Sequence, residues 1–256
     1  MKERPLIFTG ESIPLIFSGH KTQTRRVVTR TNSLVDGYPP TKEMWGQLEF
    51  ERAWVDPGPS PAGNPGPYLK VPRKWEGEET VHRVYSRFCQ VDQFWVREAW
   101  CHKWDENGPI YNAEGNLDQS CVHYRADGGE VIALDDDCGM KFNKDGTQAS
   151  PWTSPIHMPR WASRADLLNK GVRVERLLDI QHDDCIAEGV RYIPDADMPE
   201  GWPENGPNWL AAGVLAYNSE AAFYYLWNSV NEKRGYPTNL NPLVWVIEFE
   251  LIDKTS

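Results

Sequence analysis

The densest set of chemically useful side chains lies in residues 19–26, Gly-His-Lys-Thr-Gln-Thr-Arg-Arg. In this segment Lys21 stands three residues before Thr24, and Arg26 follows two residues later. A lysine close to a threonine hydroxyl can act as a base if burial lowers its pKa, or as a fixed cation for a developing oxyanion if it stays charged. An ordinary exposed turn would use the same residue types, so the segment alone leaves a structural interpretation open.

The surrounding pattern indicates how this segment is positioned. A short helix is expected to end at Gly19, and a strand fits residues 22–29. Because side chains alternate along a strand, Thr24 and Arg26 would share one face. Lys21, at the bend before the strand, can reach the same space.

The rest of the chain indicates an α+β fold in which regular blocks alternate with tracts rich in proline and glycine. One domain is expected over residues 1–256. The proline- and glycine-rich tracts predict long loops or insertions at about 31–80, 103–150 and 191–217. Besides the elements above, the pattern predicts strands at 5–8, 91–100, 172–177 and 243–250, and helices at 179–188 and 220–230, with Gly189 as a helix stop.

Charge and composition restrict the possible functions. The 256 residues carry a net charge of −10, and no run of apolar residues approaches the length of a membrane span. Residues 1–30 hold six cations and two carboxylates, so this stretch carries +4 and the remainder −14. Any nucleic-acid role must therefore rest on a local patch.

Five cysteines without a Cys-x-x-Cys spacing predict reduced thiols, no disulfide and a cytoplasmic location.

Further side chains could bind a substrate. Arg26 and Arg97 could contact a phosphate, a ribose or a base edge, or could instead pair with Glu98 or another carboxylate. Trp161 could stack on a base, although tryptophans in a chain with 12 of them also suit core packing. The motifs of dinucleotide, NTP and zincin sites do not occur, so neither a cofactor nor a metal is expected.

Five short motifs occur in a characteristic order, at residues 19–26, 92–100, 157–164, 172–177 and 244–249. Together they resemble the ASCH superfamily, a PUA-related group of small β-barrels, and in particular the larger ASCH proteins of bacteriophages and their bacterial hosts. The resemblance covers about half of the chain. It implies a small barrel with flanking short helices, into which the proline- and glycine-rich tracts are inserted.

The resemblance also implies a site. Members of the family bind nucleobases or RNA, and one branch is similar to an N4-acetylcytidine amidohydrolase that uses a lysine, a threonine and a glutamate. These fall on Lys21, Thr24 and Glu188 of this sequence, with Arg26 completing the local motif. The glutamate is assigned by its place after a strand, so three other carboxylates remain open: Asp183, Asp184 and Glu175.

The expected activity is therefore hydrolysis of the acyl group from N4-acylated cytosine or cytidine-type nucleosides, without a metal. Thr24 would be the nucleophile or water anchor, Lys21 the base or oxyanion partner, and Glu188 the proton carrier. A carboxylate near Lys21 would favour the charged lysine, with glutamate as the base. The alternative is a non-catalytic module that binds RNA or a modified nucleobase, and a strong salt dependence of binding would distinguish it.

Overall fold

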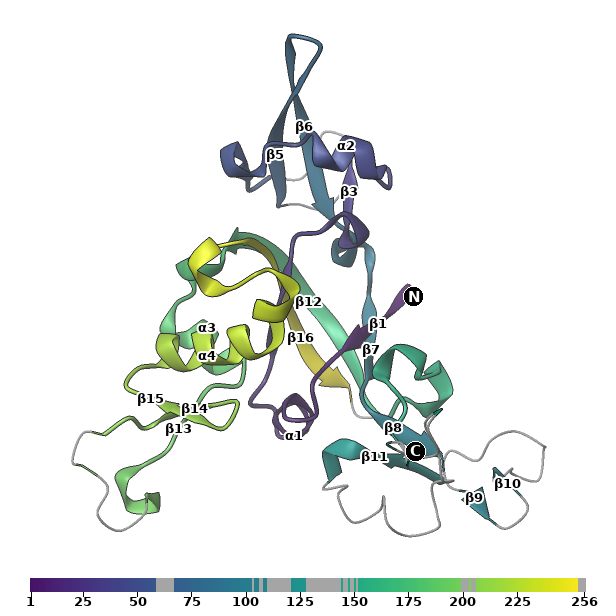
Figure 1. Cartoon of the computed structure of the whole chain (residues 1–256), viewed down its shortest axis with the longest axis vertical. Helices are drawn as coiled ribbons and strands as arrows, with labels where there is room; N and C mark the ends of the chain where they lie inside the picture. Colours follow the sequence, from purple (N-terminus) through teal and green to yellow (C-terminus); the bar gives the residue numbers. More distant parts are fainter. Residues whose placement is uncertain are drawn as a thin grey trace. The chain divides into compact units, whose positions relative to one another are not determined.

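The computed structural model describes residues 1–58, 67–102, 104–105, 108–109, 121–127, 144, 147, 150, 152–198, 203 and 206–252. These residues form a mixed α+β structure, as the sequence predicts (Figure 1). The chain divides into two compact units: unit 1 comprises Met1–Lys2, Gly19–Asp92 and Asn169–Glu250, and unit 2 comprises Glu3–Ser18, Gln93–Leu168 and Leu251–Ser256. The expectation of a single domain stays a prediction.

The sheet that carries the N-terminal motif is built in unit 1 around strand β16 (Leu243–Ile252). Its neighbours are β2 (Gln23–Val27), which runs antiparallel to it, and β12 (Asp166–Arg176). The first half of β16 is an uninterrupted run of buried apolar residues, as expected of a central strand covered on both faces. All three strands were predicted from the sequence, and each is placed close to its expected position.

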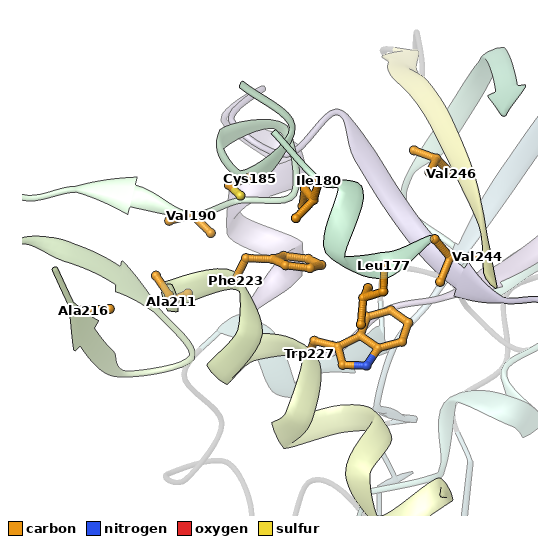
Figure 2. Packing of buried hydrophobic residues seen from close by; sticks show 11 residues of the cluster. Leu177, Ile180, Cys185, Val190, Ala211, Ala216, Phe223, Trp227, Val244 and Val246 are labelled. Atoms are coloured by element: carbon orange, nitrogen blue, oxygen red, sulfur yellow. The ribbon is translucent and has the colours of Figure 1, made fainter. Parts of the chain in front are cut away.

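Two helices cover one face of this sheet, α3 (His182–Ala187) and α4 (Ser219–Asn231). Phe223 and Trp227, four residues apart on α4, project from the same side of the helix into one apolar cluster (Figure 2). Val244 and Val246 of β16 belong to the same cluster, so the helices are held on the sheet by burial of apolar surface. The helix begins where the Asn218 side chain accepts a hydrogen bond from the main-chain N–H of Ala221, at 2.7 Å.

The end of α3 is fixed by a glycine, as predicted. Gly189 has a left-handed φ of 100°, and its N–H donates to the carbonyl of Ile186 at 2.8 Å. The N–H of Val190 donates to the carbonyl of Cys185 at 3.1 Å, which completes a Schellman motif. Glu188 is therefore the last residue before a tightly defined turn.

The tract at 31–80 contains more regular structure than its proline and glycine content predicts. Its described part forms helix α2 (Lys42–Gly46) and most of a four-stranded antiparallel sheet. The turn between the two long strands consists of Glu76 and Gly77, both with positive φ, which suits a two-residue hairpin. The strand order is β3 (Ser33–Val35), β6 (Glu78–Ser86), β5 (Tyr68–Trp75) and β4 (Trp54–Asp56).

The tract at 191–217 likewise contains a small sheet rather than only a loop. Its strands are β13 (Arg191–Tyr192), β14 (Trp209–Ala211) and β15 (Val214–Ala216). Most of the tract at 103–150 lies outside the described residues, apart from β9 (Trp104–Asp105), β10 (Gly108–Pro109) and β11 (Val122–Tyr124). The first and third tracts thus contain short strands besides loops, and that all three tracts are insertions stays a prediction.

Unit 2 pairs β1 (Glu3–Ile7) in parallel with β7 (Gln93–Arg97), and β7 pairs with the beginning of β12. Helix α1 (Ser12–Phe17) follows β1, and β8 (Trp100–His102) pairs with β11. Cys101 in β8 is disulfide-bonded, whereas Cys89, Cys121 and Cys185 are free. The prediction of no disulfide is therefore wrong, since an odd number of cysteines still leaves room for one bridge.

The described strands pair in open sheets, and within this part of the chain no set of pairings closes into a barrel. Of the helices in the described ranges, none is both long enough and apolar enough to span a membrane.

Candidate active site

The candidate site is centred on a buried ion pair between Lys21 and Glu188, both in unit 1. The Nζ atom of Lys21 lies 2.7 Å from Oε2 of Glu188 and also donates to the main-chain oxygen of Glu188 at 2.5 Å. Each residue is only 4% exposed. Their approach is fixed by the backbone, because the N–H of Thr22 donates to the carbonyl of Ala187 at 2.9 Å. The start of β2 and the end of α3 therefore hold the pair in place.

The surroundings of Lys21 oppose its positive charge. Burial lowers the pKa of Lys21 below its ordinary value of 10.5, although the carboxylate of Glu188 acts in the other direction. The nearby guanidinium groups of Arg26 and Arg25 lower this pKa further. A lysine in this setting releases its proton more readily than one in water.

The second carboxylate oxygen of Glu188 is held by Arg25 of β2. Nη1 of Arg25 lies 3.2 Å from Oε1 of Glu188 and donates to the side-chain oxygen of Gln23 at 2.7 Å. The guanidinium also lies over the ring of Phe223, 5.5 Å from its centroid. Glu188 is thus placed between a lysine and an arginine, with one oxygen directed at each.

Arg25 connects the pair to a larger charged network. Its Nη2 atom lies 2.6 Å from Oε1 of Glu175 and 3.0 Å from Oδ2 of Asp184. Arg173 of β12 binds the same two carboxylates at 3.1 and 2.7 Å and also binds Glu248 of β16. Burial acts to raise the pKa of Asp184, but the hydrogen bonds from Arg173 and Gln23 outweigh this effect, so the pKa is lowered. Asp184 is therefore stabilised as the anion.

Thr24 and Arg26 lie on β2 as predicted, on the face opposite Gln23 and Arg25. Thr24 is buried and pairs in register with Ile247 of β16, and among the described residues its hydroxyl has no hydrogen-bond partner. Burial lowers the pKa of Arg26 to about 10, so its guanidinium is still charged at neutral pH. The structure thus joins Lys21 to Glu188 and does not bring Thr24 into hydrogen-bonding contact with either.

The competing carboxylates separate clearly by position. Asp183 is exposed, while Asp184 and Glu175 are bound by arginines. Glu188 is the carboxylate whose oxygen contacts Nζ of Lys21 within the described part of the chain. This is the position that the sequence resemblance implies for the glutamate.

Arg97 and Trp161 belong to unit 2, whereas the Lys21–Glu188 pair belongs to unit 1. Arg97 donates to the carbonyl of Ile156 at 3.0 Å and lies over the ring of Trp95, 4.6 Å from its centroid. The sequence left open an ion pair between Arg97 and Glu98, and this alternative is wrong. The fully buried Glu98 is instead held by another arginine.

That arginine is Arg164, whose Nε and Nη2 donate to the two oxygens of Glu98 at 2.8 and 3.0 Å. Trp161 is 36% exposed and meets Trp100 edge to face, with ring centroids 6.0 Å apart. The second unit therefore has its own buried ion pair and an aromatic contact that is partly accessible.

Sequence reasoning missed Arg25 and Arg173. A usable signal exists for Arg25, because strand alternation places Gln23 and Arg25 on one face, and a polar pair on the covered face of a strand requires partners. For Arg173 the sequence offers no such signal, since its partners lie on other elements. Within the described ranges, no three His, Cys, Asp or Glu side chains are grouped so that they could hold a metal ion.

Comparison with known proteins adds no further constraint: no family model, no curated protein and no solved structure matches this chain.

Proposed function

We propose that this protein is an amidohydrolase that removes the acyl group from N4-acylated cytosine or cytidine-type nucleosides. The observation that carries the proposal is the buried contact of 2.7 Å between Lys21 and Glu188. These residues lie 167 positions apart and are two of the three that the resemblance to ASCH amidohydrolases implies for the catalytic set. A buried carboxylate in contact with an ammonium can supply the base and the oxyanion partner that amide hydrolysis requires.

The proposed reaction needs no group beyond water and the chain itself. Glu188 accepts a proton from the attacking water, whose oxygen bonds to the acyl carbon, and the Lys21 ammonium stabilises the oxyanion that forms. The C–N bond then breaks while the proton passes to the exocyclic nitrogen. The products are a carboxylic acid and the free cytosine or cytidine. The hydroxyl of Thr24 is assigned to anchoring the water or substrate.

The overall charge supports a small substrate over a polynucleotide. The net charge of −10 repels phosphates at long range, whereas a neutral nucleoside is indifferent to it. Arg26, charged and half-buried, is the proposed contact to the base. The ASCH-like barrel and a cytoplasmic location are part of the same proposal and rest on the sequence. The roles of Arg97 and Trp161 in binding the substrate stay predictions from the sequence.

The direct test is incubation of the purified protein with N4-acetylcytidine while the absorbance of the acylated base is followed. We expect turnover that falls by at least about 10²-fold in Lys21→Ala, because an oxyanion partner contributes on that order. Thr24→Ala should also be slow. No turnover by the folded wild-type protein, with longer N4-acyl groups also tried, would reject the proposal and favour the nucleobase- or RNA-binding module.

A further inference from the structure

Arg25 is the most completely engaged side chain around the candidate site. It is 3% exposed and donates five hydrogen bonds, to oxygens of Gln23, Glu175, Asp184 and Glu188. Its guanidinium is also packed on the ring of Phe223. These contacts restrict the guanidinium of Arg25 to essentially one orientation. An arginine fixed in this way can in turn fix whatever it binds.

What Arg25 fixes at the site is the direction of the Glu188 carboxylate. Oε1 of Glu188 accepts from Nη1 of Arg25, and Oε2 accepts from Nζ of Lys21. A carboxylate held by one oxygen can still rotate about its last bond, whereas one held by both cannot. Without Arg25, Lys21 alone would have to orient the carboxylate of Glu188.

We propose that Arg25 is a positioning residue, whose guanidinium holds Oε1 of Glu188 and thereby directs Oε2 at Lys21. The kinetic consequence rests on the proposed amidohydrolase function, whereas the geometric consequence does not. The planar guanidinium is essential to this role, because a lysine in its place would supply the charge without the fixed set of donors.

Arg173 provides a matched control from the same network. It binds two of the carboxylates that Arg25 binds, Glu175 and Asp184, while among the described contacts it does not touch Glu188 or Lys21. A merely structural role for Arg25 predicts a loss of stability in Arg25→Lys without a change in the Lys21–Glu188 contact. A positioning role makes only Arg25 matter to the Lys21–Glu188 pair.

The experiment compares Arg25→Lys with Arg173→Lys by crystal structure and by steady-state kinetics on N4-acetylcytidine. In Arg25→Lys we expect the Nζ–Oε2 distance to exceed about 3.5 Å, the limit of a hydrogen bond. We expect kcat to fall on the order of 10²-fold with KM within about threefold, since misplacement of a reacting group by about 1 Å costs that much. Arg173→Lys should leave the distance and both constants close to those of the wild-type protein.

An unchanged Lys21–Glu188 contact in Arg25→Lys, or equal effects of the two variants, would overturn the proposal. If the wild-type protein has no activity but Arg25→Lys still separates the pair, Arg25 is a positioning residue and only the amidohydrolase proposal fails. Should Arg25→Lys not fold, Gln23→Met removes the oxygen that accepts from Nη1 of Arg25, together with the amide that donates to Asp184 at 3.1 Å. We expect this variant to lower kcat about tenfold at unchanged KM, and a wild-type kcat would contradict the proposal.

Discussion

At the scale of single residues, the site consists of charges that are buried against one another. A buried ion pair is weak evidence for stability, because desolvation of both groups offsets their attraction. Nevertheless Lys21 and Glu188 are both almost completely buried. Their retention inside the protein is better explained by chemistry than by stability, because the proposed reaction requires a carboxylate base held beside a cation.

The lowered pKa has a consequence that needs no substrate. Because the pKa of Lys21 is lower in the folded than in the unfolded chain, there is a pH range below 10.5 in which the folded chain has lost this proton and the unfolded chain still holds it. The free energy of unfolding of the wild-type protein, relative to Lys21→Met, should therefore increase as the pH rises toward 10.5. Urea denaturation of both proteins at several pH values measures it. A difference that stays constant or decreases would show that folding does not lower this pKa.

The identity of the pair could be predicted from the sequence, whereas its surroundings could not. Lys21 was found from its motif, and Glu188 from its place after a strand, as the resemblance implies. Arg25 stands next to residues of the motif, yet its role depends on which strand face is covered by α3 and α4. Contacts of this kind join positions about 150 residues apart, and short-range patterns carry no information on them.

At the scale of elements, the position of Glu188 depends on how α3 ends. The Schellman motif at Gly189 requires a left-handed residue, and Glu188 immediately precedes it. This part of the fold was accessible from sequence, because a helix stop by glycine is a local signal. The short strands at 33–35 and 54–56 were not, because three residues give too little alternation to recognise.

Gly189→Ala tests this dependence. A side chain in the left-handed region costs about 1–2 kcal/mol, so we expect a loss of that size in the free energy of unfolding. Gly46→Ala is a suitable control, since this glycine lies in α2 and a Cβ there would meet nothing within 4 Å. It should be neutral or stabilising by up to about 1 kcal/mol. Equal effects of the two substitutions, measured by chemical denaturation, would contradict the role assigned to the turn.

At the scale of the whole molecule, the distribution of charge argues against tight binding of polynucleotides. The +4 of residues 1–30 is set against −14 in the rest of the chain, and four of these cations, Arg4, Lys21, Arg25 and Arg26, are buried or half-buried. A buried cation paired with a carboxylate contributes little to the attraction of phosphates. The basic patch visible in the sequence is therefore much smaller on the surface.

We accordingly expect no saturable binding of single- or double-stranded RNA at about 0.15 M salt, and only weak binding at lower salt that decreases steeply as salt is added. Fluorescence anisotropy with labelled RNA of about 20 nucleotides would measure this. Submicromolar affinity at the higher salt concentration would favour the binding module over the enzyme.

The most direct test of the central claim is the turnover of N4-acetylcytidine by Glu188→Gln compared with the wild-type protein and Asp183→Asn. Glu188→Gln keeps the shape of the side chain but cannot accept the proton, so we expect kcat to fall by about 10²-fold or more. Asp183 is exposed and lies on the same helix, so Asp183→Asn should retain nearly full activity. A Glu188→Gln protein that is folded and as active as the wild type would contradict the account.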